Sequence, residues 1–122
     1  MNRGLTLALL LLAFIVVLVG ADAMLMKDAI DENEAILTSL DEKEVATREE
    51  LSRVLDTFAD DRFLFSISVP EGYINEYDEA LAALSASVVA NEAGAYAAAR
   101  AEALAALLQI KRSALFSFGQ IL

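Results

Sequence analysis

Residues Leu5 to Ala21 read LTLALLLLAFIVVLVGA and contain no charged side chain. Arg3 precedes this stretch and Asp22 follows it. Basic residues beside a membrane segment tend to stay on the cytoplasmic side. The sequence therefore predicts a single-pass protein of the cell membrane, with its N-terminus in the cytoplasm and everything after residue 21 outside.

The same stretch is also compatible with a cleaved signal peptide, because Ala21-Asp22-Ala23 fits the A-x-A cleavage pattern. As a helix, Leu5–Gly20 covers about 24 Å, which is short of a hydrocarbon core of ~30 Å. Extending the helix through Met24-Leu25-Met26 brings it to about 33 Å. We favour the anchor, because the apolar run is long for a signal peptide and the helical pattern continues through the cut. The predicted domains are residues 1–25, the anchor or signal, and residues 26–122, an exported helical bundle.

The composition favours helices over strands throughout the exported part. Alanine and leucine, which are good helix formers, are abundant, whereas there is one proline and there are five glycines. The predicted fold class is all-α, with the N-terminal helix followed by an antiparallel bundle of three to four helices.

The first half of the exported part predicts two helices. The first runs to about Ser39 with an apolar stripe that only Asn33 interrupts, and a capping box at Ser39–Glu42, or alternatively at Asp41–Glu44, opens the second. We expect the second helix to stop or kink near Asp60-Asp61. The stretch FLFSISV at 63–69 alternates like a strand but has no partner strand, so we expect a buried continuation of this helix, ending before Pro70. The expected core positions of the second helix are Val45, Leu51, Val54, Leu55 and Phe58.

The second half predicts a helical hairpin. Pro70 suits the first turn of a third helix, and Asn91–Gly94 supplies the turn before a fourth helix over about 95–117. The sequence EALAAL occurs at both Glu79–Leu84 and Glu102–Leu107, which suggests two antiparallel helices that meet through alanines. The expected core residues are Ile74, Tyr77, Leu81, Leu84 and Val88 in the third helix, and Tyr96, Leu104, Leu107, Leu108 and Leu115 in the fourth.

Three short segments carry a resemblance to a known family. Phe63-Leu64-Phe65 precedes Glu71–Leu84, the second EALAAL leads into Leu108-Gln109-Ile110, and Gly119-Gln120-Ile121-Leu122 closes the chain. This layout resembles a family of short bacterial proteins of unknown function (domain-of-unknown-function family 4363), although this chain is richer in alanine and poorer in lysine. The resemblance implies one N-terminal apolar segment and an all-helical remainder, and it implies no activity.

Charge and residue types exclude several function classes. The net charge is −10, of which residues 22–61 contribute −9, so the surface repels phosphate backbones and we expect no nucleic-acid partner. Cysteine and histidine are absent, which removes thiolate metal sites and the commonest general base. The acidic clusters at Asp28–Glu32 and Asp60-Asp61 lack a wrapping loop for a hard cation. We therefore predict no enzyme, and no catalytic, cofactor-binding or metal-binding residue.

The apolar C-terminal tail and Asn33 indicate packing contacts, either within the chain or with a partner. The apolar tail with Phe116, Phe118, Ile121 and Leu122 follows Lys111 and Arg112; we favour its docking on the bundle, and contact with the membrane or a partner is the alternative. Asn33 on the apolar stripe either sets the register of self-association or serves packing within the chain.

These features lead to three hypotheses of function. The leading one is a membrane-anchored extracytoplasmic helical protein that acts through protein–protein contact, self-association included, or as a structural component of the envelope. The alternatives are a small ligand-sensing bundle that works with a separate signalling partner, and a secreted soluble bundle after signal cleavage.

Overall fold

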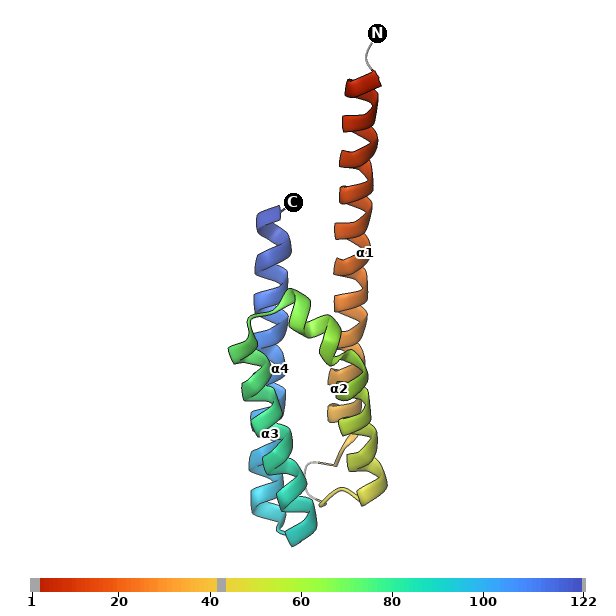
Figure 1. Cartoon of the computed structure of the whole chain (residues 1–122). Helices are drawn as coiled ribbons and strands as arrows, with labels where there is room; N and C mark the ends of the chain where they lie inside the picture. Colours follow the sequence, from red (N-terminus) through yellow and green to blue (C-terminus); the bar gives the residue numbers. More distant parts are fainter. Residues whose placement is uncertain (1–2, 42–43, 122) are drawn as a thin grey trace.

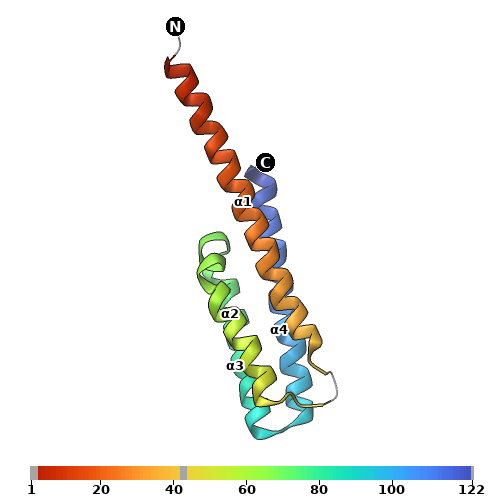
Figure 2. The same cartoon turned by 90° about the vertical axis from the view of Figure 1, so that its right-hand side faces the viewer.

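Four helices form an up-and-down bundle. The computed structural model describes residues 3–41 and 44–121, with side chains up to Leu115. The helices are α1 (Arg3–Ser39), α2 (Arg48–Ser68), α3 (Glu71–Ala90) and α4 (Ala93–Ile121). Each helix packs on the next and α4 also packs on α1, so the four close into a ring (Figures 1 and 2). The described residues contain no strand, and the all-α prediction is confirmed.

The second half of α1 is the first wall of the bundle. Its buried residues recur every three or four positions, with Ala29 and Ile30 side by side, which places them on one face of the helix. They are Met26, Ala29, Ile30, Asn33 and Leu37. The predicted stripe is therefore confirmed, including the position of Asn33 within it, and α1 ends at Ser39 as expected.

The start of α2 differs from the prediction. Thr47, and neither Ser39 nor Asp41, is the N-cap: its hydroxyl accepts from the amide of Glu50, and the Glu50 carboxylate accepts from the amide of Thr47. This reciprocal pair satisfies amides that the first turn of a helix leaves open. Asp41 Oδ1 accepts from the amide of Glu44 at 3.4 Å, ahead of the first residue of α2. A loop therefore separates α1 from α2.

The remainder of α2 differs from the prediction at three points, the first being that Leu55, expected in the core, is 36% exposed. The helix does not stop at Asp60-Asp61 but runs on to Ser68. The FLFSISV stretch is helical as predicted, but only one of its faces is buried: Phe65 is inside, whereas Phe63 is 76% and Ile67 62% exposed. Residues two apart point to different sides of a helix, so a helical FLFSISV cannot bury all its apolar residues.

The α2–α3 corner and α3 follow the sequence closely. Pro70 takes the N-cap position just before α3 and not its first turn, and Val69 ends α2 in an extended conformation. All five predicted core residues of α3 are buried. Asn91 adopts the left-handed conformation with φ 54° and ends α3, because asparagine tolerates this region better than most residues. The turn is shorter than predicted, since Ala93 and Gly94 already belong to α4.

The core face of α4 is made mainly of alanine. Tyr96 and Leu107 are buried as predicted and Leu104 is half-buried, but Leu108 is 44% and Leu115 62% exposed. The other buried residues are Ala99, Ala103, Ala106, Ile110 and Ala114. Small side chains let α4 lie close to its neighbours, and α3 and α4 form the most extensive helix pair of the bundle. The predicted contact through alanines is thus present, in a register that buries alanines in place of two leucines.

Candidate functional site

The first half of α1 projects alone from one end of the bundle. In Figure 1 this segment, drawn in red, has no helix beside it over most of its length. Large apolar side chains are exposed all round it, among them Leu5, Leu9, Phe14 and Val17. The helix is long and apolar enough to cross a membrane, and none of the residues in its most apolar 18-residue stretch is buried in the bundle. The core helix of a soluble domain would instead be mostly buried.

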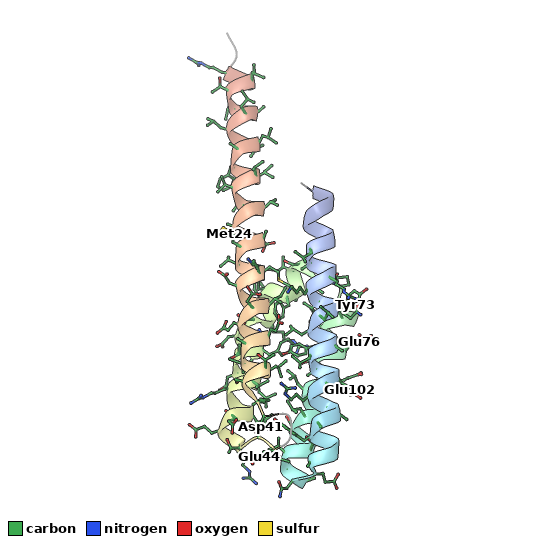
Figure 3. All side chains as sticks on the ribbon, turned by 180° about the vertical axis from the view of Figure 1, so that it is seen from behind. Met24, Asp41, Glu44, Tyr73, Glu76 and Glu102 are labelled. Carbon is green, nitrogen blue, oxygen red and sulfur yellow. The ribbon has the colours of Figure 1, made fainter. Side chains whose placement is uncertain are left out.

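The point at which α1 joins the bundle is marked by a polar contact. The hydroxyl of Ser68, the last residue of α2, donates to Asp22 Oδ2 at 3.3 Å. Met24, labelled in Figure 3, is 70% exposed, while Met26 is fully buried. Asp22 therefore lies level with the α2–α3 corner. The proposed cleavage pattern Ala21-Asp22-Ala23 lies inside the continuous helix α1.

A second polar contact joins α1 and α2 within the bundle. Asn33 is buried, and its Nδ2 donates to the carbonyl of Ala29 at 2.8 Å and to Asp61 Oδ2 at 3.0 Å. Partial burial, and then the nearby charge of Glu32, raise the pKa of the Asp61 carboxyl, although the hydrogen bond from Asn33 acts in the opposite direction. The sequence pattern did not predict that Asp61 would be the hydrogen-bond partner of Asn33.

The other acidic residues singled out in the sequence face solvent. Asp28, Asp31, Glu32 and Asp60 are exposed. Among the described residues, no group of three carboxylates comes together in a way that could hold a metal ion. Glu76 and Glu102, on the outward side of α3 and α4 (Figure 3), line a shallow groove of about 320 Å³ with Glu79. These three carboxylates lie at the surface, where water can hydrate them.

A small apolar pocket lies between α1 and α4. It has a volume of about 230 Å³, and Ala23, Met26 and Ile30 of α1 face Ala114 and Leu115 of α4 across it. Lys27, Asp31 and Lys111 also line it. Sites for small molecules usually occupy about 300–1,000 Å³. The pocket is therefore a small gap between two helices that pack side by side at the end of the bundle from which α1 projects.

The bundle also carries an exposed apolar pair on α2. Phe63 and Ile67 are four residues apart, so they are neighbours on one face of the helix. They lie in its last two turns, close to the level of Asp22, because Ser68 contacts that residue. Sequence analysis placed both side chains in the core. Only the helical register, with Phe65 inside, reveals that this pair is outside.

The apolar tail is described only in part. The backbone of α4 continues to Ile121, while the side chains of Phe116, Phe118 and Ile121, and all of Leu122, lie outside the described residues. The predicted docking of these side chains stays a prediction.

Comparisons with known proteins add no homologue. No family model, curated protein or solved structure matches this chain. The resemblance to the bacterial family of unknown function therefore stays a prediction.

Proposed function

We propose that the protein is a membrane-anchored, extracytoplasmic helical bundle that acts through contact with another protein. The observation that carries this proposal is the division of α1 into two halves. The half before Asp22 exposes apolar side chains on all sides, and the half from Met26 onward buries one stripe in the bundle. A bilayer is the environment that suits the first half, because apolar surface of that extent is unfavourable in water.

The continuity of α1 favours a retained anchor over a cleaved signal. The cleavage pattern at Ala21-Asp22-Ala23 is helical, and Asp22 accepts a hydrogen bond from Ser68. Cleavage after residue 23 would remove Asp22, and the end of the bundle would lose this hydrogen bond. The secreted bundle is the alternative that the cleavage pattern alone supports.

The exposed pair Phe63 and Ile67 supports action through protein contact. An exposed aromatic residue beside an exposed isoleucine is typical of contact surfaces, and the rest of the acidic exterior keeps the bundle soluble. The pair lies near the level of Asp22, so its partner would lie close to the membrane surface. The ligand-sensing alternative has less support. The apolar α1–α4 pocket is smaller than usual ligand sites, and the groove of about 320 Å³ on α3 and α4 is a shallow surface lined by Glu76, Glu79 and Glu102.

Topology and contact can be tested on the full chain, because it contains no cysteine. A cysteine at exposed Ser52 should react with a membrane-impermeant maleimide in spheroplasts, whereas one at Arg3 should react only after lysis. Labelling of Arg3→Cys in intact spheroplasts would contradict the orientation.

The contact face needs a separate measurement. A photoreactive phenylalanine analogue at Phe63 should give a discrete adduct in living cells, and the same analogue at exposed Glu49 of α2 serves as the matched control. An adduct at twice the 13.1 kDa mass of the chain would identify self-association, and one of another mass a different protein. Equal, diffuse labelling at both positions would contradict a contact face on α2.

A further inference from the structure

The end of α4 extends past the α2–α3 corner on the same side as the apolar half of α1. α3 and α4 meet at the turn around Asn91, but α3 has 20 residues and α4 has 29. At 1.5 Å per residue the difference of nine residues is about 13 Å. Figures 1 and 2 both show the C-terminal end of α4 beside α1, beyond the corner.

The contacts between α1 and α4 fix the depth of this overhang. Lys111 Nζ lies 4.0 Å from Glu34 Oε2, and Leu115 shares a pocket with Ala23 and Lys27. The two helices are antiparallel, so the six residues of α4 after Leu115 run beside α1 residues that precede this pocket. They add about 9 Å, which brings the end of α4 level with the last turn of the apolar segment.

The length of the apolar segment decides where the membrane must begin. Leu5–Ala21 spans only about 25 Å, roughly 5 Å less than a typical hydrocarbon core. Exposed Met24 and Leu25 supply the missing turn of α1. A bilayer whose outer headgroup region extends from Asp22 to Met24, level with the α2–α3 corner, also reaches the last turns of α4, which lie at the same level.

The sequence of this end of α4 suits such a position. Lys111 and Arg112 are followed by residues 113–122, SALFSFGQIL, which contain no charged side chain. Leu115 is exposed, although it is large and apolar, while Ala114 on the neighbouring face is buried against α1. Long basic side chains at the head of an apolar stretch can reach lipid phosphates while their stems stay in apolar surroundings.

We infer that the C-terminal end of α4, from Leu115 onward, is a second membrane-contacting element that enters the outer leaflet beside α1. This inference rests on the proposed anchoring by α1. Two antiparallel helices that enter the same leaflet would hold the bundle upright, with the α2–α3 corner against the headgroups. Anchoring by α1 alone would leave the bundle free to tilt.

Spin labels on single cysteines test the inference in the full chain. The chain is reconstituted in phosphatidylcholine vesicles with a nitroxide at position 115, 108 or 9, and collision with oxygen, which concentrates in lipid, is compared with collision with a water-soluble nickel complex. Leu108 is the matched control, because it is exposed on the same helix one heptad earlier, about 10 Å further from the membrane end. Leu9 reports the anchor.

The inference expects a ratio of oxygen to nickel collisions several-fold higher at position 115 than at position 108, and below that at position 9, because Leu115 lies near the outer edge of the bilayer and Leu9 lies deep within it. A lipid signature at position 9 with a water signature at 115 would overturn the second contact and leave the anchor standing. Protection of position 115 from both reagents would mean burial in a protein contact and would also overturn it. A water signature at position 9 would overturn the anchoring and this inference together.

Discussion

Asn33 of α1 donates a 3.0 Å hydrogen bond to the carboxylate of Asp61 on α2, across 28 positions of sequence. Its second donor hydrogen is used by the carbonyl of Ala29 in its own helix. An asparagine on a helical stripe can specify register between chains. Here the amide joins two helices of one chain, at a level where an acidic side chain from α2 can reach the buried stripe.

Asp61→Asn should stabilise the protein at neutral pH. Because the folded state raises the pKa of Asp61, that state holds its proton more tightly than the unfolded chain. The stability that Asp61 contributes is therefore complete below its unfolded pKa of about 3.9, and it is lost as pH rises through the higher folded value. Asparagine keeps an oxygen for Asn33 and cannot ionise. We expect a gain of up to about 1 kcal/mol at pH 7, which shrinks as the pH falls toward 4.

Urea unfolding of the full chain in detergent, followed by circular dichroism across this pH range, measures the difference. Glu79→Gln, which removes an exposed charge on α3, is the control and should show a much weaker pH dependence. A lower stability of Asp61→Asn at pH 7 would show that the carboxylate is a net stabiliser.

Asn33→Leu should leave the oligomeric state unchanged. Both hydrogen bonds of the amide are made within the chain, so its loss removes an internal contact. The lost hydrogen bonds cost about 1 kcal/mol each, partly offset by apolar burial of leucine. Sedimentation of the full chain in detergent compares the variant with the wild type. A shift to a smaller species would reveal that Asn33 also serves an interface between copies.

Thr47→Ala should destabilise the protein by about 0.5–2 kcal/mol, because it removes the hydroxyl that caps α2. Ser39→Ala is the matched control: Ser39 fits a capping pattern in the sequence, but its hydroxyl donates to the carbonyl of Ile36 at the end of α1. Its loss should change stability by less than about 0.5 kcal/mol. Equal effects of the two substitutions in urea unfolding would contradict the observed start of α2.

Ala103→Leu should destabilise the protein by about 1–3 kcal/mol, because Ala103 is fully buried in the core face of α4 and a larger side chain has no room there. Ala101→Leu introduces the same side chain at an exposed position of the same helix and should be nearly neutral. Similar unfolding midpoints for both variants would mean that α4 packs in another register, with its leucines inward.

The helices that the sequence predicted best are those with one unambiguous stripe. The stripe of α3 from Ile74 to Val88 has a single apolar face, and all its predicted core residues are buried. In α4 alanine occurs on every side, so the core face was predicted from the leucines. The structure instead buries alanines, which allow α4 to lie close to α3, and leaves Leu108 and Leu115 exposed. The start of α2 was misplaced because Ser39, Asp41 and Thr47 each precede an acidic residue by three positions, and local pattern cannot choose among them.

The candidate site was predictable only where it depends on local sequence. The apolar run before Asp22 needs no tertiary information to be recognised. The contacts of Asp22 with Ser68 and of Asn33 with Asp61 join residues 46 and 28 positions apart. They depend on the depth at which helices meet, which periodicity does not encode. The overhang of α4 likewise follows from two helix lengths and a shared turn.

The most direct test of the anchored bundle is cell fractionation combined with intact-mass measurement of the native protein. The account predicts the full-length chain of 13.1 kDa in the membrane fraction, retained after carbonate extraction. A soluble fragment whose mass corresponds to a start near Met24 would contradict it, and would show that α1 is cut where it enters the bundle.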